Sequence, residues 1–512
     1  MKFAKIQLKN KVYKNRRLPI FQRNFCFCSK IYRASLISLT LLLSACHTHL
    51  PQNDMLSSDS SGTIRRASKD NIYVTLSALQ HPHILQKYGG AYHNAKLERL
   101  LAKIVQKLAA TLSQKDPRQH YSVTILNSEN VNAFALPNGS IYITRGMLAL
   151  ANDCSEVAAI LAHEIAHITA NHGILRLQKQ AELKNTKHMP SRLLTHEGNK
   201  LYNPIKEQQQ LAQFSRNQEL QADSIALEML KQAGYDPFAS PHFLQSMEAY
   251  SIFRHLSGTT NTSLDFLANH PTTPQRIHLA RKKARKISVG HREKTDRDSF
   301  LKSIDGMIFG GSPQTGFVRE NRFIHPQLRV SFSVPHNFTI ENSAYTVWAS
   351  GPEKIAIRFD SLPRSFERSA NNYLKSGWIA GLDESSIQPI TLQGLSGARA
   401  RAANEQWQFD VIAILLNNHI FRFLIAAPHD SKNFAAIAAQ TVQSFHTLSF
   451  SQLKKLKPLK IRVVQVKRGE SVASLAKQMQ NTAHKEKLFR ILNALSPTQT
   501  LRAGTNVKII TE

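Results

Sequence analysis

The residues with the clearest potential for chemistry are His163, Glu164 and His167, in the sequence His-Glu-Ile-Ala-His. On a helix, residues four apart lie on one face, so both imidazoles can reach a single metal ion. Zinc held in this way lowers the pKa of a water molecule to about 7, and a carboxylate between the two imidazoles can accept its proton. The pattern predicts a zinc site with Glu164 as the general base of a hydrolytic reaction.

The motif by itself is weak support, because a chain with 22 histidines matches it by chance in about one case in twenty-five. Its surroundings strengthen it. The stretch from Asp153 to about Ala170 is apolar almost all round, which predicts a buried helix. Asp153 can cap the first turn of this helix, and Glu156 completes a capping-box pattern. A buried helix does not ordinarily carry two His and a Glu without a partner for them.

A third metal ligand is expected on another element, and Glu219 is the best candidate. It lies in a second predicted helix, from about Gln210 to Gln232, that ends before Gly234. Asp223 follows one turn later on the same face, where it can accept a hydrogen bond from the outer nitrogen of a metal-bound His. The alternative, an ordinary solvated helix face, stays open because this stretch is otherwise polar.

Three motifs in this order resemble the gluzincin peptidase family of BepA, HtpX and the CAAX prenyl proteases, which is metallopeptidase family forty-eight. They are residues 163–167, the helix with Glu219 and Asp223 that runs into residues 233–237 (Ala-Gly-Tyr-Asp-Pro), and residues 132–139 (Asn-Ala-Phe-Ala-Leu-Pro-Asn-Gly). The resemblance covers roughly residues 71–284. It implies one zinc ion per chain, bound by His163, His167 and Glu219, with Glu164 as general base and Asp223 behind the ligands.

A later motif of that family matches His270-Pro271, which Arg276-Ile277 follow. The resemblance implies that His270 can approach the zinc and hold the enzyme closed, and the alternative is an ordinary loop histidine before a proline. Ala226 and Gln221 depart from the Gly and Glu that the family often has there, which leaves the expected ligands intact. The sequence has no series of membrane-spanning stretches, so it resembles the soluble periplasmic branch.

The predicted fold class is α+β, with a mainly helical zincin-type protease domain that holds a small sheet (70–290), an α+β accessory domain (315–450) and a small C-terminal module (461–512). Expected elements of the first are a helical stretch at 71–113, strands at 121–126 and 140–144 with the turn 137–139 between them, and a loop or helical lid at 178–210. In the accessory domain, a hairpin is expected at 409–426 and a helix at 432–445. Trp348, Trp378 and Trp407 are expected in its core.

The C-terminal residues 463–510 resemble a LysM module, with a βααβ order of elements and the turn Gly469-Glu470-Ser471 after its first strand. The resemblance implies binding to the N-acetylglucosamine sugars of peptidoglycan. Degenerate copies of this module serve only as interaction domains, so both roles stay open.

The N-terminus predicts export. Residues 1–33 are basic without acids, and a short apolar run follows and ends in Leu43-Ser44-Ala45-Cys46, which resembles a lipobox. We expect a lipoprotein signal peptide (1–46), a lipid on Cys46, a flexible tether (47–69) and a periplasmic location in a Gram-negative-type bacterium. No Asp follows Cys46, which favours the outer membrane by analogy with known lipoproteins. The alternative is an uncleaved signal anchor.

Charge and cysteines agree with export. Residues 1–46 carry ten Lys and Arg and no acids, so a chain cleaved there keeps a net charge of +21 of the original +31. We expect no nucleic-acid partner, because export removes nucleic acid from reach, and anionic envelope surfaces are the better counterpart. Cys154 alone would remain free in the cleaved and lipidated chain, which excludes an intramolecular disulfide.

Together these features predict a zinc metalloendopeptidase that cleaves misfolded or misassembled envelope proteins, a quality-control role that rests on the resemblance. An extended substrate is expected to add to a sheet edge near Ala135 or residues 141–143. The alternative is a cell-wall-tethered chaperone or scaffold with a closed zinc site.

Overall fold

The structure, a computed structural model, describes residues 77, 79–112, 120–185, 204–256, 266, 270–288, 296–364 and 369–512. All of them belong to one of the two compact units of the chain, Tyr73–Glu512. The predicted signal peptide, the lipidated Cys46 and the tether lie outside the described residues. Within the described part, no helix combines the length and the apolar character that crossing a membrane requires.

Helix α4 (Cys154–Thr169) is the centre of the first part of the fold, and its side chains are buried on nearly all faces, as predicted. The Asp153 carboxylate accepts a hydrogen bond from the Glu156 N–H at 2.8 Å, which confirms the predicted cap. The Glu156 carboxylate accepts from the N–H of Asn152 at 2.8 Å, one residue before the partner that a capping box requires. Glu156 therefore binds the backbone of Asn152, the residue before the N-cap, and not that of Asp153 itself.

The helical stretch predicted at 71–113 is interrupted. Helix α2 (Ala95–Ala109) begins only after Asn94, whose side chain accepts hydrogen bonds from Lys96 N–H and Leu97 N–H. Gly89 and Gly90 precede it with positive φ angles of 78° and 91°, which a helix does not allow. The apolar residues at helical spacing, Leu97 to Leu108, all lie in α2, after this break.

The small sheet has the strand order β1-β3-β2, with β1 (Ser122–Leu126), β2 (Ala133–Ala135) and β3 (Ser140–Thr144). The two predicted strands, β1 and β3, pair in parallel, and the turn at residues 137–139 joins β2 to β3. Because β3 is the central strand, residues 141–143 cannot offer a sheet edge, and that part of the substrate prediction is wrong. The edge expected at Ala135 is present, on β2.

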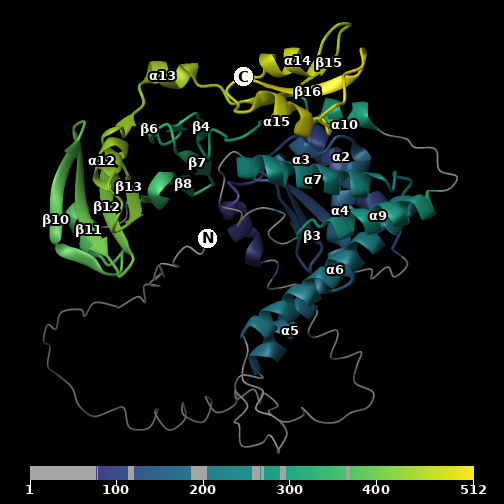
Figure 1. The fold of residues 1–512 in the computed structure, drawn as a ribbon, viewed down its shortest axis with the longest axis horizontal. Helices are drawn as coiled ribbons and strands as arrows, with labels where there is room; N and C mark the ends of the chain where they lie inside the picture. The colour runs from purple at the N-terminus through teal and green to yellow at the C-terminus, as the bar shows by residue number, and fades with distance from the viewer. Residues whose placement is uncertain are drawn as a thin grey trace, which may run out of the picture. The chain divides into compact units, whose positions relative to one another are not determined.

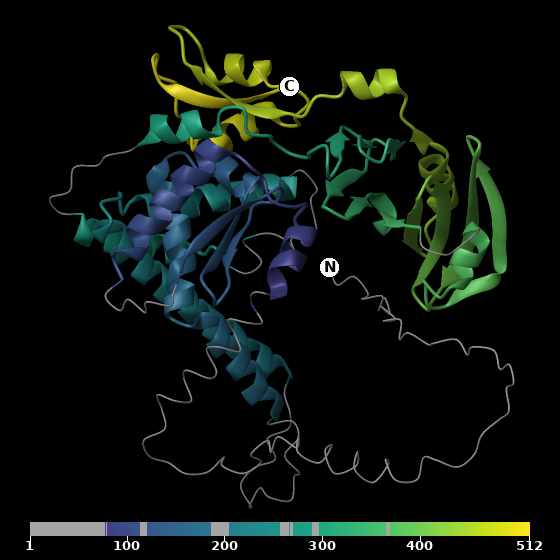
Figure 2. The same cartoon turned by 180° about the vertical axis from the view of Figure 1, so that it is seen from behind.

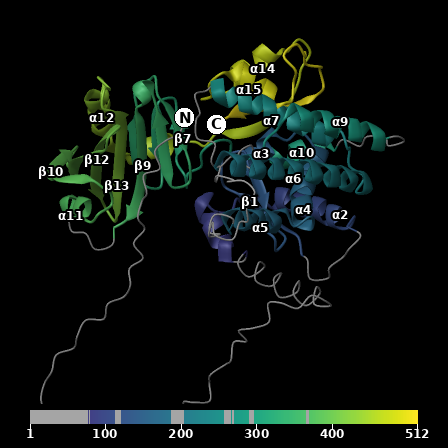
Figure 3. The ribbon, with the colours of Figure 1, turned by 60° about the horizontal axis from the view of Figure 1, so that its bottom comes forward.

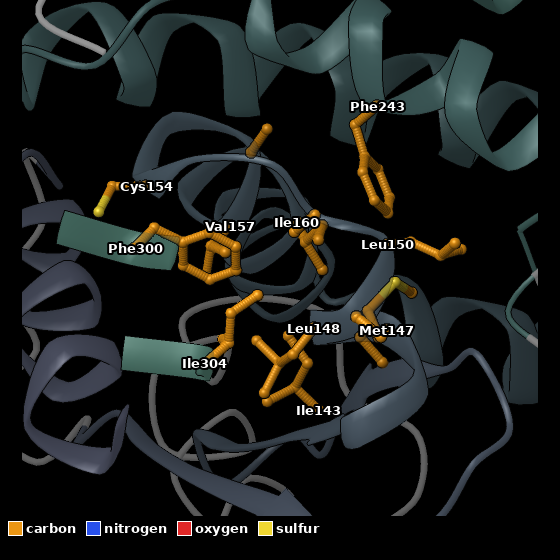
Figure 4. Close-up of a cluster of buried hydrophobic side chains, with 14 of the residues drawn as sticks. Ile143, Met147, Leu148, Leu150, Cys154, Val157, Ile160, Phe243, Phe300 and Ile304 are labelled. Atoms are coloured by element: carbon orange, nitrogen blue, oxygen red, sulfur yellow. The ribbon is translucent and has the colours of Figure 1, made fainter. Parts of the chain in front are cut away.

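The remaining helices of this part are α3 (Arg145–Leu150), α5 (His172–Asn185), α6 (Pro204–Gln232), α7 (Ala239–Leu256), α9 (Pro274–Ile287) and α10 (Arg297–Ile304). Helices α5, α6, α7 and α10 pack against α4, and α9 packs against α6 and α7. Figure 1 shows them grouped with the small sheet, and Figure 2 shows the group from behind. Helices α4 and α6 lie next to each other (Figure 3). Aliphatic and aromatic side chains from α3, α4, α7 and α10 form the core between them (Figure 4). This packing places α6 where its side chains reach those of α4.

The next part is rich in β-structure, and with the helical first part it confirms the predicted α+β class. A seven-stranded sheet has the order β10-β11-β12-β13-β9-β8-β7, and a four-stranded sheet has the order β14-β6-β5-β4. The bounds are β4 (Phe317–Arg319), β5 (Arg322–His325), β6 (Val330–Ser333), β7 (Thr339–Asn342), β8 (Thr346–Ser350), β9 (Ala356–Pro363), β10 (Leu382–Leu392), β11 (Leu395–Ala403), β12 (Trp407–Leu416), β13 (His419–Pro428) and β14 (His446–Thr447). Three helices accompany them: α11 (Ala370–Lys375), α12 (Phe434–Gln443) and α13 (Phe450–Lys455).

Two local predictions in this part are confirmed and one is wrong. Strands β12 and β13 form the predicted hairpin, with Asn417 in the left-handed region at φ 53°, and α12 is the predicted helix. Trp348 is not a core residue, because 38% of it is exposed. It lies opposite Arg358 on the neighbouring strand, with the guanidinium 5.9 Å from the ring centre, and the period of two in β8 points it away from the core.

The C-terminal segment has the order β15 (Lys460–Gln465), α14 (Val472–Gln478), α15 (Lys485–Leu492) and β16 (Asn506–Thr511), with the two strands antiparallel. Its apolar side chains belong to the same core cluster as those of α4. Lys508 is fully buried and donates from Nζ to the carbonyl oxygens of Ala149 and Ala151, at 2.8 and 2.7 Å. The segment is thus packed firmly against the end of α3.

Candidate metal centre

Four side chains from three places in the sequence bring metal-binding atoms together. Helix α4 supplies His163 and His167, α6 supplies Glu219, and the segment before α9 supplies His270. One donor atom of each lies within 4.8 Å of all the others, and His163, Glu219 and His270 are buried. The sequence predicted each of these residues, and the packing of α4 on α6 makes them neighbours.

The spacing of the donor atoms suits a tetrahedral zinc ion, whose ligands at about 2.0–2.2 Å lie about 3.3–3.6 Å from one another. His163 Nε2 lies 3.1 Å from His167 Nε2 and 3.3 Å from Glu219 Oε2. His167 Nε2 lies 3.4 Å from Glu219 Oε1. His270 Nδ1 lies 3.2 Å from His163 Nε2 and 3.1 Å from Glu219 Oε1. The imidazoles of His163 and His167 and the carboxylate of Glu219 form a donor set that zinc commonly takes, and His270 adds a third imidazole.

A second layer of side chains fixes the first. Asp223 Oδ1 lies 3.1 Å from His163 Nδ1, which is the contact predicted for it. Arg276 of α9 donates from Nε and Nη2 to the two carboxylate oxygens of Asp223, at 2.7 and 2.8 Å. Its Nη1 lies 2.9 Å from Glu219 Oε2 and donates to the Pro271 carbonyl at 3.0 Å. The buried guanidinium therefore connects the Glu219 and Asp223 carboxylates with the segment that carries His270.

The charges of the cluster call for a cation among the donor atoms. Burial would lower the pKa of His163, but the hydrogen bonds that its ring donates to the carboxylates of Asp223 and Glu219 outweigh this effect and raise the pKa to about 10. Burial would likewise raise the pKa of Glu219, but His270, His163 and His167 hold it well below its usual range. The Glu219 carboxylate thus attracts positive charge to the point where the imidazoles meet, and Asp223 stabilises a hydrogen on the outer nitrogen of His163. A divalent cation at that point supplies this charge and leaves the imidazoles neutral.

Glu164 lies beside the donor atoms without being one of them. Burial raises the pKa of its carboxyl, against the opposing effect of His270 and His163. Its Oε1 is buried and has no hydrogen-bond partner among the described residues, and His270 Nε2 is 3.8 Å away. A buried carboxylate oxygen without a partner is costly unless a ligand or water completes it. Its position beside the cluster is the one that a general base requires.

His270 is held in place from the outside. The Phe266 ring stacks on it, with ring centres 4.4 Å apart and an angle of 20° between the planes. The Phe266 N–H donates to the Val131 carbonyl at 2.9 Å, and the His270 N–H donates to the Phe266 carbonyl at 2.8 Å. These contacts hold the His270 ring beside the other donor atoms of the cluster.

Sequence reasoning missed two residues of this site. Arg276 appeared only as part of the motif after His270, and its contacts with Asp223 and Glu219 could not be read from the sequence. His172 begins α5 and lies 2.9 Å from His167, between the two Nδ1 atoms. It follows His167 by five residues, which is not a helical spacing, so no periodicity pointed to it.

Replacement of Arg276 by Ala is expected to destabilise the fold by about 3–5 kcal/mol, because it leaves two carboxylates buried without their cation. Arg276→Lys should lose less, since it keeps the charge but not the two-pronged contact with Asp223. Urea denaturation of both variants measures the effect, with Arg285→Ala, exposed on the same helix, as the control. An Arg276→Ala midpoint equal to that of the unmodified protein would contradict this assignment.

A small cavity of about 50 Å³ adjoins the cluster on the His167 side. It is lined by the end of β2 (residues 135–137) and by the last turn of α4 with the start of α5 (residues 167–174). The volume equals that of a few water molecules, or of a small aliphatic side chain. An edge strand and a side-chain cavity thus lie together next to the candidate metal position.

Residues 95–284 match the family model described as Peptidase family M48. The mitochondrial metalloendopeptidase OMA1 of Schizosaccharomyces pombe is 25% identical over 201 residues, which are 38% of this chain and 56% of that protein. The beta-barrel assembly-enhancing protease of Yersinia pestis is 29% identical over 179 residues, 33% of this chain and 36% of that protein. Mitochondrial metalloendopeptidase OMA1 of Arabidopsis thaliana is 31% identical over 166 residues, 31% of this chain and 30% of that protein.

The chain thus spans about half or less of the length of these relatives. Two solved structures align at TM-scores of 0.22. One is from Bacteroides thetaiotaomicron VPI-5482, with 14% identity over 36% of this chain and 73% of its own. The other is cyanobacterial PsbP from Synechocystis sp. PCC 6803, with 9% identity over 27% of this chain and 98% of its own. Scores of this size do not establish a shared fold.

Proposed function

We propose that this chain, whose residues 95–284 match Peptidase family M48, is a zinc-dependent metalloendopeptidase. The observation that carries the proposal is the group of donor atoms of His163, His167 and Glu219, with the unpartnered Glu164 oxygen beside it. The relatives named above are proteases or endopeptidases by name, which supports the same reaction class.

His163, His167 and Glu219 would hold the zinc ion, which when bound would supply a Lewis acid for the scissile carbonyl and lower the pKa of water. Glu164 removes the proton of the attacking water and delivers it to the leaving amine. Asp223 holds His163 in the orientation that directs Nε2 to the centre of the cluster. Arg276 keeps the Glu219 and Asp223 carboxylates in place.

The substrate is proposed to lie extended along β2. Leu136 N–H donates to Ser140 O and Thr144 N–H donates to Asn132 O, so these pairs are the hydrogen-bonded ones of the β2–β3 ladder. Bonded and non-bonded pairs alternate in an antiparallel ladder, so the N–H and C=O of Ala135 face away from β3. A peptide strand can bond to them, with one of its side chains in the cavity beside His167. Such binding recognises the main chain of the substrate more than its sequence. It therefore suits unfolded or misassembled proteins as substrates.

His270 is proposed as the regulatory ligand. Its Nδ1 completes a four-atom group, and a fourth protein ligand occupies the position that water needs. The geometry therefore fits a closed enzyme that opens when His270 withdraws. The same closure, if permanent, would make the chain a scaffold or chaperone, which is the second candidate function.

The cellular setting is proposed from the sequence. The lipobox-like Leu43-Ser44-Ala45-Cys46 supports a lipid-anchored envelope protease, on the periplasmic side of the outer membrane, that acts in protein quality control. The βααβ order of residues 460–511 is compatible with a LysM-like module, and we include peptidoglycan as a proposed partner. No role in binding nucleic acid is proposed.

A comparison of the purified chain with its His270→Ala variant tests this function. Both are expected to bind one zinc ion, and the variant is expected to cleave an unfolded protein such as casein faster, because one closing ligand is gone. His278→Ala, an exposed histidine of α9, is the control and should behave like the unmodified protein. Zinc bound without cleavage in either protein would favour the scaffold, and a chain that binds no zinc would refute the proposal.

A further inference from the structure

His172 lies behind His167 in the way that Asp223 lies behind His163. Its side chain is buried, and its Nδ1 lies 2.9 Å from His167 Nδ1. On its other side, His172 Nε2 lies 3.2 Å from Gln221 Oε1. The Gln218 side chain donates from Nε2 to the His172 carbonyl at 2.9 Å, so α6 holds both the ring and the backbone of this residue.

With the Gln221 amide oriented as in the structure, one arrangement of hydrogens satisfies this chain of contacts with both rings neutral. The Gln221 carbonyl oxygen can only accept, so His172 Nε2 carries a hydrogen and donates it. The Nδ1 of a neutral His172 is then an acceptor, and His167 Nδ1 must be the donor. His167 Nε2 keeps its lone pair, and that atom faces His163 and Glu219 at 3.1 and 3.4 Å. This is the tautomer that a metal ligand requires.

We propose that His172 is a positioning residue for the zinc ligand His167, and that Gln221 in turn positions the His172 ring. This inference rests on the proposed zinc site. It also distinguishes the two histidine ligands: His163 is backed by the Asp223 carboxylate, and His167 by a neutral imidazole and a neutral amide. A carboxylate partner raises ligand basicity more than a neutral one, so His167 is the weaker ligand of the pair.

The first test compares two replacements of His172 in the purified full chain. His172→Leu keeps much of the volume but cannot accept a hydrogen bond, and His172→Asn places an amide oxygen near the position of Nδ1. We expect the zinc dissociation constant, measured by competition with a chromophoric chelator, to rise about 10–100-fold in the Leu variant. The Asn variant should stay close to the unmodified protein, and His278→Leu, at an exposed histidine, serves as the control.

Gln221 gives a second pair of variants that leaves both imidazoles in place. Gln221→Leu should weaken zinc binding, and Gln221→Glu should strengthen it, because a carboxylate accepts more strongly from His172 Nε2. Nitrogen-15 NMR of the histidine rings should show the Nδ1–H tautomer of His167 in the zinc-bound protein, and a mixture of tautomers in zinc-free His172→Leu. If His172→Leu does not fold, as judged by circular dichroism, the zinc affinities of Gln221→Leu and Gln221→Glu test the positioning role instead.

The outcomes separate this inference from the function it rests on. Unchanged zinc affinity in His172→Leu or in Gln221→Leu would overturn the positioning role while leaving the zinc site intact. An equal loss in His172→Asn and His172→Leu would also overturn it, since packing alone would explain that result. An unmodified chain that binds no zinc would refute the zinc site itself.

Discussion

Replacement of Glu164 by Gln should reduce kcat/KM for casein about 10²–10⁴-fold, with bound zinc unchanged. The amide has nearly the same shape as the carboxylate but cannot take up a proton. Glu164 makes none of the contacts that join the four donor atoms, so its replacement leaves the metal position intact. Cleavage rates and zinc content of the same preparation measure the two effects separately.

Glu248→Gln is the matched control, because Glu248 is an exposed glutamate on α7. It should retain full activity. In the unmodified enzyme, kcat/KM should fall as the pH falls through the pKa of Glu164, and burial raises that pKa above the usual range for glutamate. Substantial cleavage by Glu164→Gln would contradict the role of this residue as the base.

Removal of zinc with a chelator should abolish cleavage and lower the melting temperature by about 5–10 °C. A ligand at 100 times its dissociation constant contributes about 2.7 kcal/mol, and each kcal/mol shifts a domain of the size of the predicted protease domain (70–290) by about 2–4 °C. The physical reason is local. Without the cation, protons on the buried imidazoles must compensate the negative charge of the buried carboxylates. Zinc added back should restore both properties, as measured by thermal denaturation and casein cleavage.

Glu219→Ala separates loss of the metal from side effects of the chelator. This variant lacks one of the three predicted ligands, so it should bind little zinc, and its melting temperature should not respond to added zinc. Glu248→Ala is expected to respond as the unmodified protein does. Cleavage that survives complete removal of zinc would exclude the metallopeptidase function.

The sequence predicted helix α4 and the positions of His163, Glu164 and His167 on it, because these features depend on local rules. The cap at Asp153 needs only a carboxylate and three following N–H groups, and the facing of His163 and His167 needs only the helical repeat. The same repeat placed Asp223 one turn from Glu219. The hairpin at Asn417 also followed from local turn chemistry. The exposed Trp348 was mispredicted, because residue type does not show which face of a strand meets solvent.

By itself, therefore, the sequence determined the chemical type of the site: two imidazoles on one helix face, a carboxylate between them and a carboxylate pair on a second helix. Only the tertiary structure decided how these groups are joined. Packing of α4, α6 and α9 brings Arg276 onto Asp223 and Glu219, places His172 between His167 and Gln221, and makes β2 rather than β3 the edge beside the site. Such contacts join residues up to 57 positions apart, and no periodicity along the chain encodes them, because they depend on how whole elements pack.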